Sequence, residues 1–97
     1  MSNKINAAIQ VLPKSSSKHP YELVDLAIGA IKNSGLPYEV TPFETVIEGT
    51  FEEVTRLIAS IQESVFEAGG EEMMIYTKMQ IRKDQDVDIE EKMGKYR

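Results

Sequence analysis

The chain has 97 residues, of which 41% are hydrophobic and 28% charged, and its formal net charge is −5. This composition excludes wholesale disorder, and no apolar run approaches the roughly 20 residues needed to cross a bilayer. The acidic balance argues against nucleic-acid binding, which depends on clustered Lys and Arg. Because this length suits a single core, we expect one domain over residues 1–97.

The sequence contains no cysteine. Disulfides, thiolate zinc sites, iron–sulfur clusters and cysteine nucleophiles are therefore excluded. The first residues, up to Asn6, lack the apolar core of a signal peptide. We therefore expect a cytoplasmic protein.

The first half of the chain predicts a strand, a loop and a helix. Residues 4–12 alternate as a strand, with Ile5, Ala7, Ile9 and Val11 on one side and Asn6, Ala8, Gln10 and Leu12 on the other. The polar stretch 13–18 reads as a flexible loop. Residues 21–34 carry apolar side chains at helical spacing after Pro20, which suits a first helical position. Gly35 and Pro37 end this helix, with Gly35 in a left-handed conformation.

The second half predicts two short extended stretches, a helix and a long strand. Residues 37–41 and 43–49 read as a hairpin interrupted at Pro42. Thr50 and Glu53 form a capping box that begins a helix ending at Gly69 and Gly70. Residues 72–82 alternate as the longest strand. The order β-α-β-β-α-β predicts a ferredoxin-like α+β sandwich, an antiparallel four-stranded sheet with both helices on one face.

The charged tail, residues 83–97, predicts one short helix capped by the run from Asp88 to Glu91, with Ile89 and Met93 on one of its faces. The uncovered sheet face is expected to carry Asn6, Ala8, Gln10, Leu12, Tyr76, Lys78, Gln80 and Arg82. An ordinary antiparallel sheet face that is partly exposed to solvent explains this mixture. The alternative is a face that packs against another subunit and encloses a polar pocket.

No set of residues supports catalysis or a metal site. His19 is the only histidine, and its place at a helix entrance is typical of a cap or a surface residue. Asp84, Asp86 and Asp88 lack the glycine and final glutamate of a calcium loop. The loop after the first strand contains Lys14 and Lys18 but not the arginine expected of an acyl phosphate hydrolase. We therefore expect no enzyme, no metal and no cofactor.

One segment is more specific. Glu48 lies within a β-rich stretch, where a carboxylate is either exposed or paired with a cation. The run YEVTPFETVIEG, residues 38–49, preceded by SGLP and followed by TFEEV, resembles the thiamine-binding protein family of small ferredoxin-like domains. YELVDLAIGAIKNSGL resembles the first helix of that family and IYTKMQIRKDQDVDIEEKMGKY its last strand and tail, so the resemblance covers nearly the whole chain.

The resemblance implies non-catalytic binding of thiamine or its hydroxymethylpyrimidine portion by a homo-oligomer, usually a tetramer. Carried over residue by residue, it makes Thr45 and Glu48 the first ligand residues, with Gly49 allowing close backbone approach. Tyr38 and Phe43 are candidate stacking groups or core residues, and Phe43 replaces a smaller or more flexible residue common in the family. The shared sheet face adds Gln10 and Lys78. The alternative is an assembly or regulatory module of the same fold with a degenerate site.

Overall fold

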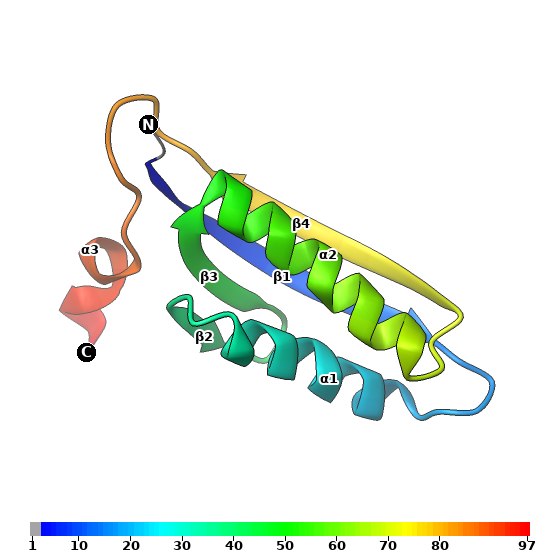
Figure 1. Ribbon diagram of the computed structural model, residues 1–97. Helices are drawn as coiled ribbons and strands as arrows, with labels where there is room; N and C mark the ends of the chain where they lie inside the picture. Colours follow the sequence, from blue (N-terminus) through cyan, green and yellow to red (C-terminus); the bar gives the residue numbers. More distant parts are fainter. Residues whose placement is uncertain (1–2) are drawn as a thin grey trace.

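The computed structural model describes residues 3–97, so the first two residues of the expected domain lie outside the described chain. In chain order the elements are β1 (Lys4–Lys14), α1 (Pro20–Asn33), β2 (Tyr38–Val40), β3 (Thr45–Thr50), α2 (Phe51–Glu67), β4 (Glu72–Gln80), α3 (Ile89–Met93) and the 3₁₀ helix η1 (Gly94–Tyr96). The strands form one sheet in the order β2-β3-β1-β4, and every neighbouring pair is antiparallel. The ferredoxin-like α+β architecture is confirmed (Figure 1).

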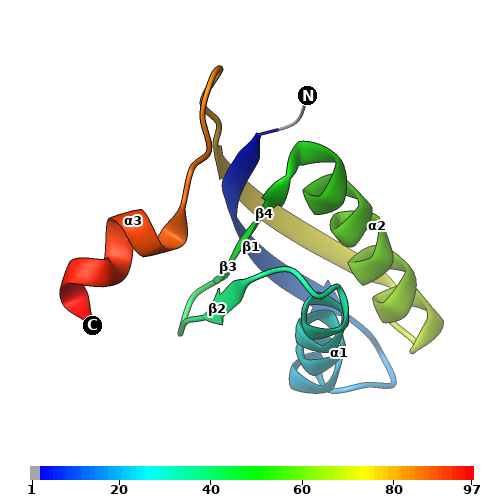
Figure 2. The same cartoon turned by 60° about the vertical axis from the view of Figure 1, so that its left-hand side comes forward.

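Helices α1 and α2 cover one face of the sheet, while α3 lies on the opposite side (Figure 2). The core forms between the covered face and the stripes of the two helices. Its buried side chains are Ile5, Ala7 and Ile9 of β1, Ile47 of β3, Leu23, Ala27 and Ile31 of α1, and Val54, Leu57, Ile61 and Val65 of α2. The predicted alternation of β1 therefore placed its apolar side chains on the correct face.

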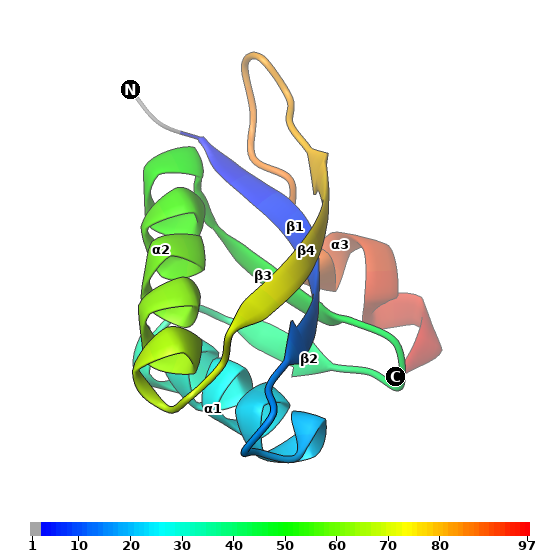
Figure 3. The same cartoon turned by 90° about the vertical axis from the view of Figure 1, so that its right-hand side faces the viewer.

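Strand β1 is longer than its sequence indicated. The expected loop began at Pro13, but the strand continues to Lys14. Pairing of β1 with β3 stops at Ile9, whereas pairing with β4 continues to Lys14. Beyond Ile9 the strand has a neighbour on one side only, so Pro13, which has no N–H to donate, is tolerated there. Figure 3 shows β4 lying along β1.

The other element limits differ by a few residues from those expected. Strand β3 begins at Thr45 and not at Phe43, because Thr41 and Glu44 close a turn. The Thr41 hydroxyl donates to the Glu44 carbonyl oxygen at 2.6 Å, and the Thr41 N–H donates to the same oxygen at 3.0 Å. Strand β4 ends at Gln80, two residues short of the predicted limit at Arg82. The predicted short helix in the tail is present as α3, capped by Asp88.

Both predicted helix starts have side-chain caps. His19 Nδ1 accepts a hydrogen bond from the Tyr21 N–H at 3.1 Å, which gives the single histidine a structural role at the start of α1. At α2, Thr50 Oγ1 accepts from the Glu53 N–H at 3.1 Å and Glu53 Oε1 accepts from the Thr50 N–H at 2.9 Å. The capping box read from the sequence is thus confirmed.

The loop between β1 and α1 is held by its serines. The Ser16 hydroxyl and its N–H donate to Glu71 Oε1 at 2.6 and 2.8 Å, and the Ser15 hydroxyl donates to the Gly69 carbonyl oxygen at 2.8 Å. The bonds from Ser16, its hydroxyl first, lower the pKa of the Glu71 carboxyl. The two bonds therefore stabilise the folded protein at pH values above the ordinary carboxyl pKa. That contribution is lost as pH falls through the lowered pKa of Glu71 in the folded state. The loop is therefore more constrained than its composition indicated.

Replacing Gly35 by alanine is expected to destabilise the fold by about 1 kcal/mol. Gly35 ends α1 with a φ of 78°, and an added Cβ would meet nothing within 4 Å, so the cost is one of backbone conformation alone. Denaturant unfolding of Gly35→Ala measures it. The matched control is Gly29→Ala, which also meets nothing within 4 Å but lies inside α1. We expect it to stabilise the protein by about 0.5–1 kcal/mol, and equal effects of the two changes would contradict the assignment.

Candidate functional site

Glu48 is a carboxylate buried on the sheet face opposite α1 and α2. It stands directly across from Asn6 of β1, and its exposed fraction is 8%. Its Oε1 accepts a hydrogen bond from the N–H of Ile89, the first residue of α3, at 2.7 Å. The Glu48 N–H donates to the Pro37 carbonyl oxygen at 3.0 Å, which brings the start of β2 alongside it. Glu48 therefore joins the sheet edge to the C-terminal segment.

The C-terminal segment, residues 83–97, docks on the open sheet face through buried apolar and polar contacts. Val87 and Ile89 are buried, and the Val87 N–H donates to the Lys4 carbonyl oxygen at 2.9 Å. Asn6 Nδ2 donates to the Val87 carbonyl oxygen at 3.0 Å. That bond fixes the orientation of the Asn6 amide, because a flipped amide would set two acceptors against each other. The Asn6 Oδ1 atom is buried without a hydrogen-bond partner in the described chain. The bonds of Val87 to Lys4 and to Asn6, together with the buried side chains, hold the segment against this end of the sheet.

A cavity of roughly 290 Å³ lies between α3 and the edge of the sheet at β2 and β3. It is lined by Pro37, Tyr38, Glu39, Glu48, Asp88, Ile89, Glu90 and Arg97. Four of these residues carry carboxylates and one carries a guanidinium. Arg97 forms ion pairs with Glu39 and with Glu90, the latter at 3.3 Å. The cavity wall is therefore strongly acidic, and a cation suits it better than an anion.

Two of the predicted ligand residues, Tyr38 and Glu48, line this cavity, and the others do not. Tyr38 lies opposite Ile47, which places its side chain on the helix-covered face, so Glu48 is the one of the two that lies on the open face. Thr45 lies opposite Ile9 and Gly49 opposite Ile5, which places both on the helix-covered face. The β1–β3 register runs without an extra residue, so no bulge turns Thr45 toward Glu48. Thr45 and Glu48 can serve one ligand only where two subunits meet.

Gln10 and Lys78 lie on the open face, as the alternation predicted, because they stand opposite Tyr76 and Ala8. Lys78 forms an ion pair with Glu44 at 3.3 Å. It also lines a second cavity on that face, of roughly 340 Å³, together with Asn6, Ala7, Ala8, Val46, Met79, Gln80 and Lys92. Phe43 lies in the turn between β2 and β3 with an exposed fraction of 82%, so it belongs neither to the core nor to a cavity wall described here.

Sequence reasoning missed several groups of the acidic cavity. Glu39, Asp88, Glu90 and Arg97 were not among the predicted ligand residues. Alternation in β2 places Glu39 opposite Val46 and on the same face as Glu48. The two buried apolar residues Val87 and Ile89, set among charges, were the signal that the tail docks, although they do not indicate where.

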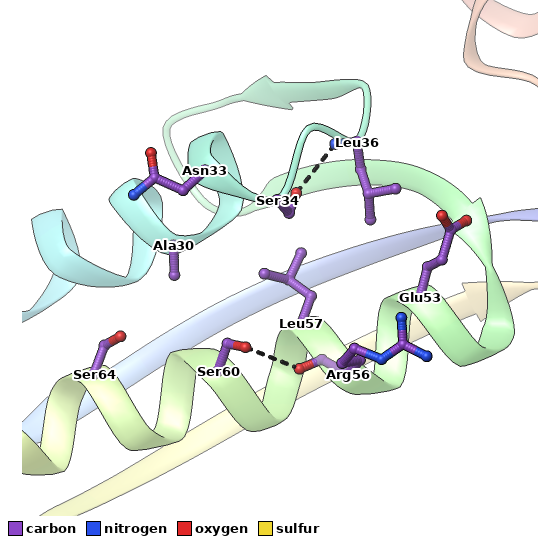
Figure 4. A pocket seen from close by; sticks show the side chains of 9 residues that line it. All are labelled: Ala30, Asn33, Ser34, Leu36, Glu53, Arg56, Leu57, Ser60 and Ser64. Carbon is purple, nitrogen blue, oxygen red and sulfur yellow. Dashed lines mark hydrogen bonds between the residues drawn. The ribbon is translucent and has the colours of Figure 1, made fainter.

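A third hollow, of roughly 390 Å³, lies between α1 and α2 (Figure 4). Its lining residues are Ala30, Asn33, Ser34, Leu36, Glu53, Arg56, Leu57, Ser60 and Ser64. Two of its three serine hydroxyls are used internally, since Ser60 Oγ donates to the Arg56 carbonyl oxygen at 3.2 Å and Ser34 Oγ accepts from the Leu36 N–H at 3.1 Å. None of the predicted ligand residues lines this groove.

Within residues 3–97 no group of three or more His, Asp or Glu side chains is placed to hold a metal ion. No helix in the same range has the length and apolar character needed to cross a membrane.

Comparison with known proteins gives the family. Residues 7–97 match the model of the thiamine-binding protein family, and the chain belongs to that family. A UPF0045 protein of Clostridium perfringens is 34% identical over 92 residues, which cover 95% of this chain and 96% of that protein.

Two solved structures give the same fold. A domain of unknown function, DUF77, from Bacillus cereus has a TM-score of 0.94 and 34% identity, and the match covers 100% of this chain and 93% of that one. A Thermotoga maritima protein assigned provisionally to thiamine biosynthesis or salvage has a TM-score of 0.85 and 30% identity, covering 97% of this chain and 99% of that one.

Proposed function

We propose that this protein binds thiamine or its hydroxymethylpyrimidine portion without catalysing a reaction, in the acidic cavity between α3 and the sheet edge. The observation that carries the proposal is that Glu48, on the open sheet face, lies in one cavity with the carboxylates of Glu39, Asp88 and Glu90. The thiazolium ring of thiamine carries a permanent positive charge, which carboxylates attract. The amino group of its pyrimidine can donate hydrogen bonds to carboxylate oxygens.

The comparisons support a thiamine-related role. The family is named for thiamine binding, and the Thermotoga maritima protein, of known structure, is assigned provisionally to thiamine biosynthesis or salvage. We propose no cofactor and no nucleic-acid partner, in keeping with the net charge of −5. We also propose a cytoplasmic location, with which the absence of cysteine is consistent.

Calorimetric titration with thiamine, hydroxymethylpyrimidine and choline tests the proposal. We expect saturable binding of thiamine, weaker binding of hydroxymethylpyrimidine, which lacks the thiazolium charge, and negligible binding of choline, which offers no pyrimidine donors. Equal affinity for thiamine and choline would reduce the site to a general cation site. No heat with either thiamine or hydroxymethylpyrimidine would contradict the proposed ligand.

We further propose that the functional unit is a homo-oligomer, a tetramer built from dimers. Strands β2 and β4 are the sheet edges, and Met74, Tyr76 and Met79 of β4 expose apolar surface beside the unpaired edge. A boundary between subunits is also the arrangement in which Thr45 and Glu48 can contact one ligand. Light scattering at micromolar concentration is expected to give a mass near four times the chain mass of 10.9 kDa. A monomer mass would contradict this prediction.

A second candidate function is an assembly or regulatory module of the same fold that binds no vitamin. The observation in its favour is that Glu48 already accepts a hydrogen bond from Ile89 and that Arg97 of the same segment pairs with carboxylates of the cavity. Under this alternative the C-terminal segment fills the site permanently, and the same titration gives no binding.

A further inference from the structure

We propose that Arg97 determines ligand affinity as an internal competitor, its guanidinium holding the position in the acidic cavity that a cationic ligand takes. This inference rests on the proposed function. Arg97 supplies the one cationic side chain among the residues that line the cavity, and it pairs with Glu39 from β2 and with Glu90 from α3. It therefore bridges the two walls between which the ligand is proposed to bind.

The charges of the cavity favour one cation at this place. Without Arg97, the carboxylates of Glu39, Glu48, Asp88 and Glu90 would line the cavity without a counter-charge from its own wall. Like charges brought together repel, and one guanidinium relieves that repulsion. A guanidinium and a thiazolium share the relevant properties, since both are planar, delocalised and weakly hydrated. The same carboxylates can therefore attract either group.

The contacts of Arg97 can be broken without releasing α3. The Arg97 side chain is 45% exposed, and ion pairs that are this open to solvent contribute little to stability. The helix is anchored separately, by the bond from Ile89 to Glu48 and by the burial of Val87. A ligand that displaces Arg97 thus loses only exposed ion pairs and meets a wall whose shape is kept.

The opposite role for Arg97 is that it binds an anionic group of the ligand, such as a phosphate ester. The ion pairs argue against that role, because Glu39 and Glu90 both contact the guanidinium and neutralise it. An incoming anion would have to displace two carboxylates in a cavity that is already acidic. The competitor role is therefore the one that these contacts favour.

The test compares Arg97→Gln with the unmodified protein in calorimetric titrations with thiamine, thiamine monophosphate and guanidinium chloride, the last at concentrations far below those that denature. We expect Arg97→Gln to bind thiamine and guanidinium about 3- to 10-fold more tightly. In this variant the ligand no longer has to break the exposed ion pairs of Arg97, which are worth little energy. The matched control is Arg82→Gln. Arg82 pairs with Glu91 and donates to the Asp86 carbonyl oxygen on the same segment, but it does not line the cavity.

The outcomes separate the two proposals. The competitor role is overturned if the unmodified protein and Arg97→Gln bind each cation with equal affinity. It is also overturned if Arg82→Gln tightens binding as much as Arg97→Gln does. Both results count whether or not thiamine binds. If Arg97→Gln loses affinity for thiamine monophosphate but not for thiamine, Arg97 binds the ligand's anion and the inference is also overturned. If guanidinium binds Arg97→Gln more tightly while thiamine binds neither protein, the competitor role stands and the proposed thiamine function fails. Thermal midpoints of the variants identify any that do not fold.

Discussion

Glu48→Gln is expected to weaken thiamine binding about 10- to 100-fold, which corresponds to a loss of about 1.5–3 kcal/mol for a charge-assisted contact. The substitution is informative because the side-chain carbonyl of glutamine can still accept the hydrogen bond that Glu48 Oε1 accepts from Ile89 at 2.7 Å. The C-terminal segment should therefore stay docked while the cavity loses one negative charge. Calorimetry measures the affinity, and the thermal midpoint reports whether the fold is kept.

The matched control is Glu44→Gln. Glu44 pairs with Lys78 at 3.3 Å and does not line the acidic cavity. The control removes one negative charge from the protein, so it separates a local contact from the general effect of net charge. We expect its affinity for thiamine to change by less than about 2-fold, because the Glu44 carboxylate lies outside the cavity and is already paired with Lys78. Unchanged affinity of Glu48→Gln would return Glu48 to a purely structural role under α3.

The largest loss of stability is expected for Ile47→Ala, about 2–5 kcal/mol in the free energy of unfolding. Ile47 has no exposed surface and belongs to the core between the sheet and the two helices. It lies on β3, opposite Ala7 on one side and Tyr38 on the other, so a cavity there is surrounded by strands that cannot easily close it. Denaturant unfolding monitored by circular dichroism gives the value.

A control on the neighbouring strand separates the effect of burial from the effect of shortening any apolar side chain in the sheet. Val40 lies on β2 with an exposed fraction of 53%. Val40→Ala should change the free energy of unfolding by about 0.5 kcal/mol or less. A loss below about 1 kcal/mol for Ile47→Ala would mean that the packing of Ile47 is not what stabilises the sheet.

The fold could be predicted because its local signals and its long-range pattern agree. The alternation of β1, the capping box of Thr50 and Glu53, and the left-handed Gly35 are each visible in a few consecutive residues and are all present in the structure. The end of β1 was misjudged because Pro13 is acceptable only where the strand has a single neighbour. That condition depends on where β3 stops pairing, which no local pattern reveals.

The candidate site could be predicted in part. Glu48 was selected from the sequence, whereas Glu39 was not, and the register of β2 with β3 and of β3 with β1 is what places both on the open face. The docking of the C-terminal segment could not be predicted, because it depends on contacts between residues some 40 to 80 positions apart, such as Ile89 with Glu48 and Val87 with Asn6. Asp88, Glu90 and Arg97 enter the cavity only through that docking, so no spacing within the tail could assign them.

We propose above that thiamine binds in the acidic cavity between α3 and the sheet edge. A crystal structure of the protein grown with thiamine tests it most directly. The predicted result is a thiamine molecule in contact with Glu48, with the Arg97 side chain withdrawn from Glu39. Thiamine bound instead in the groove between α1 and α2, or on the sheet away from Glu48, would contradict the account.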